Sequence, residues 1–316
     1  MKICLVGEGA FANKHIDAIA RIEDVEVSVI CGGVAETTEA VANARGIPFY
    51  TTDLAEALNQ PGVDAVILAT PTGLHATQAI QVMRSGKHVL IEIPMADNLA
   101  DAQKLVEVQQ ETGLVAMVDH VRRFNPSHKW IHNKIKSGEL QLQQLDVQTY
   151  FFRRENINAL GQPRRWTDHL LWHHACHTVD LFQYQTGGPA AQAFAMQGPS
   201  HPDMGIAMDM CIGMKAATGA ICTLSLSFNN NGPLGTYFRY ICDNGTYIAR
   251  YDDLFDGNDN PIDLSQVDVA MDGVELADRE FFAAIAQDRE PNSSVQQCLE
   301  AMKTLDRLEQ SMISQA

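Results

Sequence analysis

The sequence predicts an α/β fold in two parts, a Rossmann dinucleotide-binding domain over residues 1–120 and an α+β domain over residues 121–316. Short apolar runs alternate with helix-like segments through the first 120 residues, which is typical of parallel βαβ units. The first apolar run ends in a glycine-rich turn. After residue 120 the pattern changes, and a turn at residues 243–245 joins two segments of a predicted antiparallel sheet.

The N-terminal elements follow from continuous apolar runs, which are typical of strands buried on both faces. The predicted strands cover residues 3–6, 25–30, 65–69, 88–91 and 115–118. The predicted helices cover residues 11–21, 36–45, 54–58, 72–84 and 101–112. Asp97 and Asn98 are expected to cap the last of these helices.

The C-terminal elements have a different texture. We expect helices over residues 125–136, 168–186, 278–287 and 294–311. A strand is expected over residues 144–153, and residues 191–251 are expected to form the sheet, with strands at 219–228, 237–241 and 246–251.

Composition and charge exclude several classes of function. The chain has 23 Lys and Arg against 39 Asp and Glu, a net charge of −16, which argues against nucleic acid or an anionic membrane as a partner. The seven cysteines form no CxxC pair and lie mostly in apolar runs, which predicts buried reduced thiols. No apolar stretch reaches the roughly 18 residues of a membrane span, and the N-terminus lacks the pattern of a signal peptide. We therefore expect a cytoplasmic protein.

The first strand leads into a GxGxxA motif, which predicts a dinucleotide site. Gly7 suits the tight turn, Gly9 lets the backbone approach a pyrophosphate, and Ala12 keeps helix and strand close. The pyrophosphate would lie at the positive end of the following helix. The predicted cofactor contacts in this loop are Gly7, Gly9, Ala10, Phe11 and Ala12.

The end of the second strand bears on the choice between NADP and NAD. An acidic residue there would bind the ribose 2′-hydroxyl and repel a 2′-phosphate. This chain has Cys31, Gly32 and Gly33 instead, with no acid before Glu36. Thr37 is placed to donate to a phosphate from the next helix, together with Thr38. The pattern favours NADP, with NAD as the alternative.

The next two strands also end in candidate cofactor residues, because open α/β sheets bind ligands at the carboxyl ends of their strands. For His75 the alternative is a packing role against the loop. The candidates are Thr70, Pro71, Thr72 and His75 after the third strand, and Glu92, Ile93 and Pro94 after the fourth.

Histidines cluster in the predicted helix at residues 168–186. At helical spacing His169, His173 and His177 share one face, and Asp180 follows His177 at i+3. Three interpretations are open: a metal site, general acid–base catalysis by one histidine, or a polar packing face. We favour a catalytic His177 or His173, with Asp180 as the residue that orients His177, and we expect no metal.

A basic segment precedes this helix. Between Arg122 and Arg165 nine basic residues stand against three acids, a local charge of +6. Arginine binds carboxylates at two points, so the segment favours a dicarboxylate substrate over a set of surface ion pairs. The predicted substrate residues are Arg122, Arg153, Arg164, Arg165, Trp166 and His169.

Together these motifs resemble the glucose–fructose oxidoreductase/inositol dehydrogenase (Gfo/Idh/MocA) family over nearly the whole chain. The similar segments are residues 70–75, 85–94, 121–126 and 173–180. The resemblance implies a nicotinamide-dependent dehydrogenase whose second domain carries an open-faced sheet, through which members usually associate. It therefore implies a homodimer, and it places Arg123 at the cofactor.

Two positions depart from the family pattern. Ile93 stands where the family has its catalytic lysine, and His173 stands where the helix motif has an aspartate. Within the family, residues 146–180 and 279–296 are similar to dehydrogenases that oxidise the cyclic hemiacetal of a carboxylated muconate semialdehyde, an intermediate of protocatechuate cleavage. The product of those enzymes is a pyrone dicarboxylate, and NADP is their usual acceptor. The alternatives are a sugar or polyol dehydrogenase and a dinucleotide sensor without catalysis.

Overall fold

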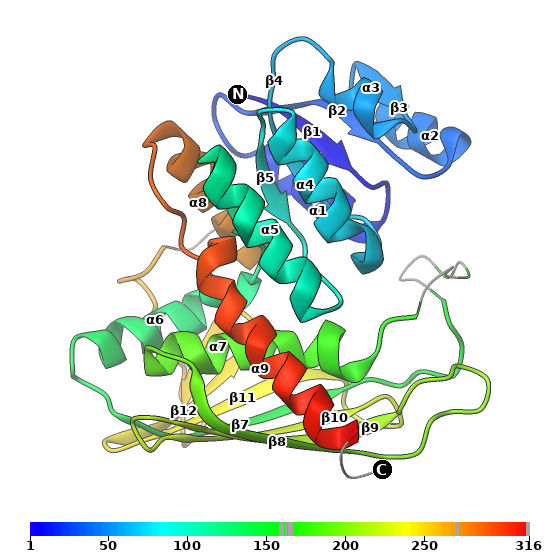
Figure 1. The fold of residues 1–316 in the computed structure, drawn as a ribbon. Helices are drawn as coiled ribbons and strands as arrows, with labels where there is room; N and C mark the ends of the chain where they lie inside the picture. Colours follow the sequence, from blue (N-terminus) through cyan, green and yellow to red (C-terminus); the bar gives the residue numbers. More distant parts are fainter. Residues whose placement is uncertain (158–160, 162, 164–166, 269–271, 314–316) are drawn as a thin grey trace. The chain divides into compact units, whose positions relative to one another are not determined.

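The computed structural model describes residues 1–157, 161, 163, 167–268 and 272–313 (Figure 1). The chain divides into two compact units. Unit 1 comprises Met1–His120 and Val274–Leu299, and unit 2 comprises Val121–Gly273 and Glu300–Ala316. The sequence-based boundaries assigned residues 274–299 to the C-terminal domain, whereas the structure packs them with unit 1.

Unit 1 is built on a six-stranded parallel sheet with the order β3-β2-β1-β4-β5-β6. This order confirms the predicted Rossmann architecture. The sheet adds a short β3 that the apolar pattern did not predict. Its strands are β1 (Lys2–Val6), β2 (Glu26–Cys31), β3 (Phe49–Thr51), β4 (Val63–Leu68), β5 (His88–Ile91) and β6 (Ala116–Val118).

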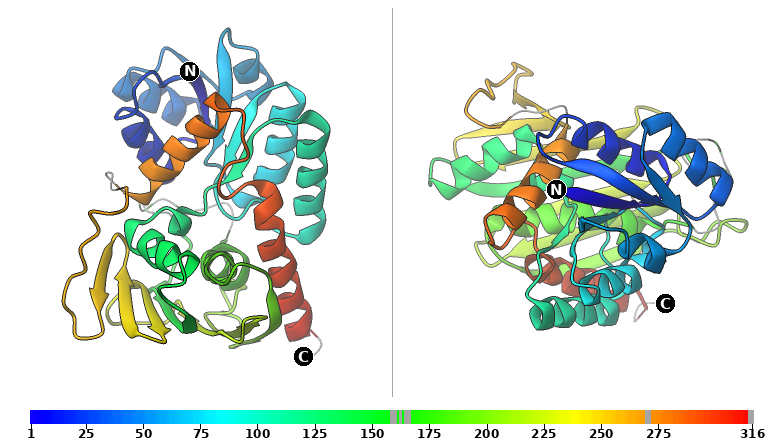
Figure 2. Two further views of the ribbon diagram at one scale, coloured as in Figure 1. Left: turned by 90° about the vertical axis from the view of Figure 1, so that its left-hand side faces the viewer. Right: turned by 90° about the horizontal axis from the view of Figure 1, so that it is seen from above.

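Helices cover the strands of this sheet. The last four residues of β1 and of β4 are completely or almost completely buried, which explains their continuous apolar sequence. Helices α4 and α5 lie side by side (Figures 1 and 2). The helices are α1 (Ala10–Ile19), α2 (Ala35–Arg45), α3 (Leu54–Leu58), α4 (His75–Arg84) and α5 (Leu99–Thr112).

Residues 274–299 join unit 1 through hydrogen bonds as well as packing. They include most of α8 (Gly273–Ala286) and the start of α9 (Val295–Ile313). The Ser293 carbonyl accepts from the Val118 amide at 2.9 Å, and the Ser293 hydroxyl donates to the Val118 carbonyl at 2.8 Å. The segment thus continues the hydrogen bonding beyond β6, a long-range pairing that local sequence patterns do not report.

Unit 2 contains a seven-stranded sheet with the order β13-β12-β11-β7-β10-β9-β8, antiparallel except for the pair β7 and β10. Helices α6 (Pro126–Lys136) and α7 (Cys176–Thr186) lie on one face of this sheet (Figure 2). In β10 exposed and buried residues alternate, as expected for a sheet covered on one face. The strands are β7 (Leu142–Tyr150), β8 (Ala190–Gln197), β9 (Asp209–Ala216), β10 (Ile221–Ser227), β11 (Gly235–Cys242), β12 (Gly245–Arg250) and β13 (Asp253–Asp256).

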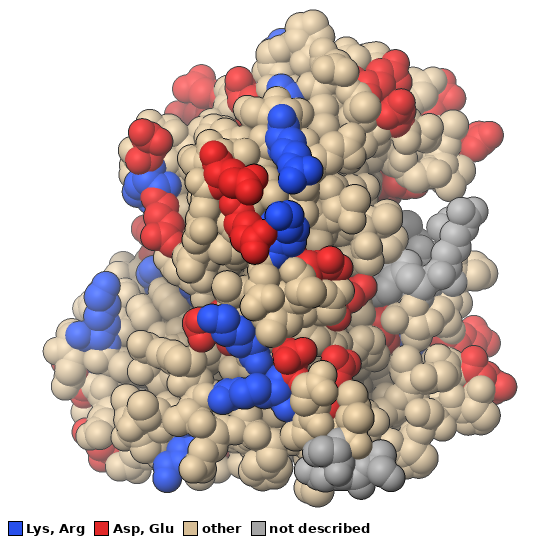
Figure 3. All heavy atoms as spheres, viewed as in Figure 1, with Lys and Arg blue, Asp and Glu red and all other residues tan. Residues whose placement is uncertain are grey.

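On the face drawn in Figure 3, acidic and basic side chains are intermixed and form no large basic patch. Exposed pairs such as Lys104 with Glu107 and Lys303 with Glu300 belong to this pattern. All seven cysteines are free and six are buried; Cys211 is exposed, contrary to the expectation of buried thiols. Among the described helices none is both long and apolar enough to cross a membrane.

Candidate functional site

The glycine-rich loop of unit 1 has the geometry that a dinucleotide needs. Gly7 follows β1 with φ of +118°, and a Cβ there would lie 2.4 Å from the Ala69 carbonyl oxygen. Only glycine fits this close approach of two strand ends. Ala12 is completely buried, as expected for the position that keeps α1 close to β1, whereas Phe11 is exposed.

Gly9 is the N-cap of α1, and no side chain caps this helix. The first turn, which begins at Ala10, contains no acidic residue, so the positive end of the helix dipole is not neutralised locally. A Cβ on Gly9 would meet no atom within 4 Å, because it would project into open space. An uncapped helix start beside open space fits the pyrophosphate of a dinucleotide.

Glu8 stands between these two glycines in the sequence, and its side chain reaches the segment that follows β2. Its carboxylate accepts from the Gly33 amide at 3.0 Å to both oxygens and from the Val34 amide at 3.2 Å. The Thr37 hydroxyl lies 3.4 Å from the same carboxylate. The segment after β2 has no acid of its own before Glu36, but the loop after β1 supplies one to Gly33 from 25 residues earlier, which the sequence pattern did not predict.

Gly32 has little space because Glu8 and Thr38 lie beside it. A Cβ on Gly32 would lie 2.0 Å from the Thr38 hydroxyl oxygen and 2.8 Å from Glu8 Oε2. The Thr38 hydroxyl donates to the Val34 carbonyl at 2.7 Å, so its hydrogen is used within the helix. The Thr37 hydroxyl also lies 3.0 Å from the Val34 carbonyl oxygen, so what distinguishes Thr37 is its second contact, at 3.4 Å, with the Glu8 carboxylate.

The loops after β4 and β5 are joined by His75. Its Nδ1 lies 2.8 Å from the Pro94 carbonyl oxygen and its Nε2 lies 2.8 Å from the Thr70 carbonyl oxygen. The ring is almost completely buried. This geometry favours the packing alternative for His75, since the ring holds two candidate cofactor loops together. The same loops contain Pro71, Thr72 and Ile93.

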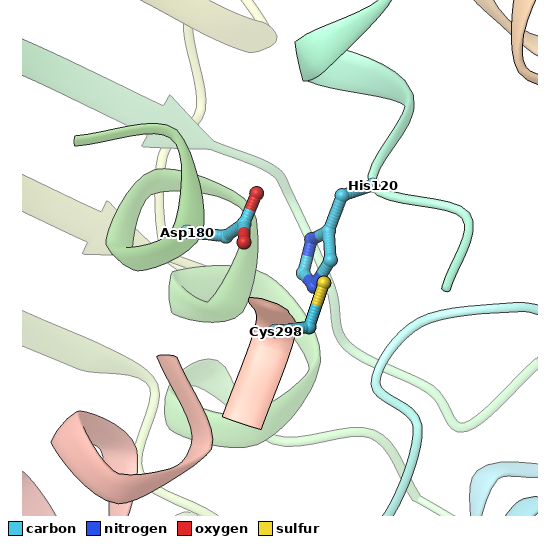
Figure 4. Close-up of side chains that lie close together, drawn as sticks. All are labelled: His120, Asp180 and Cys298. Carbon is cyan, nitrogen blue, oxygen red and sulfur yellow. The ribbon is translucent and has the colours of Figure 1, made fainter. Parts of the chain in front are cut away.

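Glu92 belongs to a buried network centred on His15, which the sequence analysis did not single out. His15 Nδ1 lies 2.9 Å from Asp278 Oδ1, and His15 Nε2 lies 3.2 Å from Glu92 Oε1 and 3.8 Å from Asp119 Oδ2. Burial opposes the charged imidazole, but the carboxylates of Asp278 and Glu92 together raise the pKa of His15 well above its ordinary value. The network therefore favours the charged form of the His15 imidazole, held between carboxylates. Figure 4 draws two further buried side chains of unit 1, those of His120 and Cys298.

The histidine segment of unit 2 is not one regular α-helix as predicted. Residues Leu170–Ala175 form a π-helix that continues into α7, and His169 is its N-cap. Because a π-helix turns less per residue, the i, i+4 argument for one shared face does not apply across the segment. His173 and His169 are nevertheless neighbours, with ring centroids 4.9 Å apart in an edge-to-face arrangement.

His173 and His177 differ in how the fold holds them. His173 Nδ1 accepts from the His169 amide at 3.1 Å, so the hydrogen bond fixes its ring. Burial, together with the neighbouring His169, lowers the pKa of His173 to about 3. His177 lies in the first turn of α7 and is partly exposed.

Asp180, predicted to orient His177, is bound by Arg123. The carboxylate accepts from Arg123 Nε at 2.8 Å and from Nη2 at 2.6 Å, and both residues are buried. The Arg123 guanidinium also lies over the Tyr184 ring, 4.8 Å from its centroid. The structure shows these two residues in a buried two-point ion pair, whereas the family resemblance implied a place for Arg123 at the cofactor.

Arg153, predicted to bind substrate, is also occupied by an internal carboxylate. Its guanidinium binds Asp168 through Nη1 and, at 3.0 Å, through Nη2, and it lies over Phe228. Asp168 Oδ2 lies 3.0 Å from His174 Nε2, which completes a chain of three charged or polar groups. Burial would raise the pKa of Asp168, but His174 and Arg153 hold it well below its usual range.

Arg122 is a predicted substrate residue whose guanidinium has no carboxylate partner among the described residues. Within the described residues no carboxylate oxygen lies within 4.0 Å of it; its Nη1 lies 3.4 Å from the Asn125 side-chain oxygen and its Nε has no partner. It packs between Phe238 and Tyr251, and burial lowers its pKa. Three other predicted substrate residues lie outside the described residues: Arg164, Arg165 and Trp166.

Two family models match this chain, one in the N-terminal part and one in the C-terminal part. Residues 1–120 match the family model described as the oxidoreductase family with an NAD-binding Rossmann fold, and residues 126–268 match bacterial oxidoreductases, C-terminal. The chain is 62% identical over 309 residues to the 4-carboxy-2-hydroxymuconate-6-semialdehyde dehydrogenase of Sphingobium sp. (strain NBRC 103272 / SYK-6), covering 98% of each protein.

Solved structures share the fold at low identity. A levoglucosan dehydrogenase in complex with NADH superposes with a TM-score of 0.87 at 18% identity, over 100% of this chain and 98% of that one. An oxidoreductase from Agrobacterium radiobacter, in complex with NAD+, L-tartaric acid and magnesium, gives 0.84 at 17% identity, over 100% and 97%. The chain belongs to the Gfo/Idh/MocA family of oxidoreductases.

Proposed function

We propose that this protein oxidises the cyclic hemiacetal of 4-carboxy-2-hydroxymuconate-6-semialdehyde to 2-pyrone-4,6-dicarboxylate. The observation that carries the proposal is the 62% identity, over 98% of both chains, to a dehydrogenase of that name. The departures from the family pattern at Ile93 and His173 fit this proposal. A hemiacetal hydroxyl is more acidic than the hydroxyl of a secondary alcohol, so a weaker base can remove its proton without a lysine.

The dinucleotide would be held by the glycine loop of unit 1. Gly7 and Gly9 leave room for the pyrophosphate at the α1 start, and Gly33 and Thr37 offer donors near the adenosine ribose. When bound, a nicotinamide supplies the hydride acceptor. We propose NADP as the acceptor, with NAD as the alternative, because the segment after β2 has no acidic residue before Glu36 and its amides would suit a phosphate once Glu8 has moved away.

His177 is the proposed base. As the ring carbon of the hemiacetal loses hydride, the proton on its hydroxyl oxygen passes to the His177 imidazole, and that oxygen becomes the carbonyl of the pyrone. His173 is less suited, since a pKa of about 3 makes it a poor proton acceptor at neutral pH. We propose that His173 instead helps to position the substrate, with His169.

Arg122 is the proposed anchor for a substrate carboxylate. A partly buried guanidinium whose Nε is buried and has no carboxylate partner among the described residues is unusual, because buried charges are normally paired. A dicarboxylate would supply the missing partner. Arg153 is already bound by Asp168, so its role in this proposal is to position Asp168 and His174.

We also propose a homodimer through the uncovered face of the unit 2 sheet. Phe194 and Met196 on β8 and Ile221 on β10 are exposed apolar side chains of that sheet. A second copy of the chain would cover them. Sedimentation equilibrium at micromolar concentrations would yield twice the chain mass, and a monomer throughout would contradict this assignment.

The proposed reaction can be tested directly. The semialdehyde would be prepared by enzymatic 4,5-cleavage of protocatechuate and mixed with this protein and NADP or NAD. We expect reduced nicotinamide and pyrone dicarboxylate to appear in equal amounts. Absence of turnover with both dinucleotides, in a protein shown to bind them, would overturn the proposal; myo-inositol and glucose would then test the sugar-dehydrogenase alternative.

A further inference from the structure

The carboxylate of Glu8 takes the position of an anion at the end of β2. It accepts hydrogen bonds from the Gly33 and Val34 amides, and the Thr37 hydroxyl lies within reach. No Lys or Arg nitrogen lies within 4.0 Å of it among the described residues, so its charge is held by neutral donors alone. A second anion could use these donors only if the Glu8 carboxylate moved away from them.

The glycines around Glu8 are needed for this arrangement. Gly32 must lack a side chain, since a Cβ would lie 2.8 Å from Glu8 Oε2, and Gly33 presents its amide to both carboxylate oxygens. In Rossmann folds the acid that recognises the adenosine ribose normally follows the second strand. Here the first loop delivers a carboxylate to the same place, and the segment after β2 supplies the space for it.

We propose that Glu8 is the residue that sets the choice between NAD and NADP. With NAD, the carboxylate keeps its donors and accepts from the ribose hydroxyls. With NADP, the 2′-phosphate takes over the Gly33, Val34 and Thr37 donors, and Glu8 has to move away. The inference rests on the proposed function only in requiring that unit 1 binds a dinucleotide.

The test compares dissociation constants for NADP+ and NAD+, measured by titration calorimetry without any substrate. Glu8→Gln removes the charge of the side chain. Glu8→Ala also removes the acceptor from the Gly33 and Val34 amides. We expect both variants to shift the ratio of affinities toward NADP+ by about tenfold or more, equivalent to about 1.4 kcal/mol, with the larger shift for alanine. Glu36→Gln is the matched control. Glu36 lies in the first turn of α2, the helix that also contains Thr37, and it makes no hydrogen bond to the Gly33 and Val34 amides.

Two further measurements keep the outcomes separate. Thermal unfolding without ligand verifies that each variant is folded, and Glu8→Asp, which keeps the charge, is expected to keep a ratio near that of the parent protein. An unchanged ratio in both Glu8→Gln and Glu8→Ala, or a shift toward NAD+, would overturn the inference. A protein that binds both dinucleotides but does not oxidise the semialdehyde would overturn the proposed function and leave the role of Glu8 standing.

Discussion

Arg123 and Asp180 form a buried, two-point ion pair in unit 2, with contacts of 2.8 Å from Nε and 2.6 Å from Nη2. The two residues are 57 positions apart in the sequence and hold the turn that contains Arg123 against α7. The pair therefore fixes the helix that carries His177. Its main effect on catalysis would be to position that helix.

Removing one partner of this pair should destabilise unit 2 strongly. Asp180→Leu and Arg123→Met each remove one partner of this buried ion pair, which costs about 3 kcal/mol or more of unfolding free energy. The double variant Arg123→Met/Asp180→Leu should lose less than the sum of the single variants. Urea unfolding of all three proteins measures this, and strictly additive losses would show that the pair is not coupled.

Gly7 and Gly9 should respond differently to alanine. Gly7→Ala forces a Cβ against the Ala69 carbonyl at a positive φ, so it should lower the stability of unit 1. Gly9→Ala has an ordinary φ of −81° and no protein atom in its way, so the fold should be unaffected. It should weaken dinucleotide binding about tenfold or more, because the methyl group enters the space left for the ligand. Thermal unfolding and calorimetric titration separate the two effects; unchanged affinity in a folded Gly9→Ala would contradict the assigned site.

His177 and His173 can be distinguished by kinetics. His177→Asn should lower kcat by a factor of about 10² to 10⁴, the usual contribution of a general base. His173→Asn should keep the acidic limb of the pH–rate profile in place, because the pKa of His173 is about 3 and its ring stays neutral across the accessible range. A displaced acidic limb in His173→Asn, with normal kcat in His177→Asn, would exchange the two roles.

Arg122 should control substrate affinity. Arg122→Met removes a charged partner for a carboxylate, a contribution of about 1.5 to 3 kcal/mol, and should lower kcat/KM about tenfold to a hundredfold. Arg154→Gln is the control, since the exposed Arg154 donates to the Asn229 side chain and the Arg153 carbonyl. Equal kcat/KM for Arg122→Met and the parent protein would remove Arg122 from the substrate site.

Because of His15, the free energy of unfolding should fall as pH rises above 6.5. Its folded pKa is raised above the ordinary 6.5, so its contribution is complete below pH 6.5 and is lost as pH rises through the folded value. His15→Gln should lower the urea midpoint at pH 6 and flatten this decline, because it leaves Glu92 and Asp278 without their cation. The half-buried His88, whose pKa burial lowers, adds stability as pH rises toward 6.5, below the range of the His15 decline, so His88→Gln should leave that decline unchanged. A His15→Gln profile parallel to that of the parent protein would contradict a charged His15.

Much of the fold could be predicted because its signals are local. Buried parallel strands read as continuous apolar runs, and five of the six strands of the Rossmann sheet were found in this way. The short β3 carries three residues, none of them buried, and gives no such signal. The turn that Gly7 makes is also local, since its positive φ requires a residue without a side chain.

The sequence by itself determined the Rossmann architecture, the glycine loop and the family, because turn conformation and hydrophobic periodicity depend on residues that are close together in the sequence. Only the tertiary structure decided which charged groups meet. Glu8 accepts a hydrogen bond from Gly33, and Asp168 and Asp180 form ion pairs with Arg153 and Arg123. The physical reason is that an ion pair or hydrogen bond depends on distances of about 3 Å between side chains. Those distances are set by how distant elements pack, and a motif that names the residue types cannot specify them.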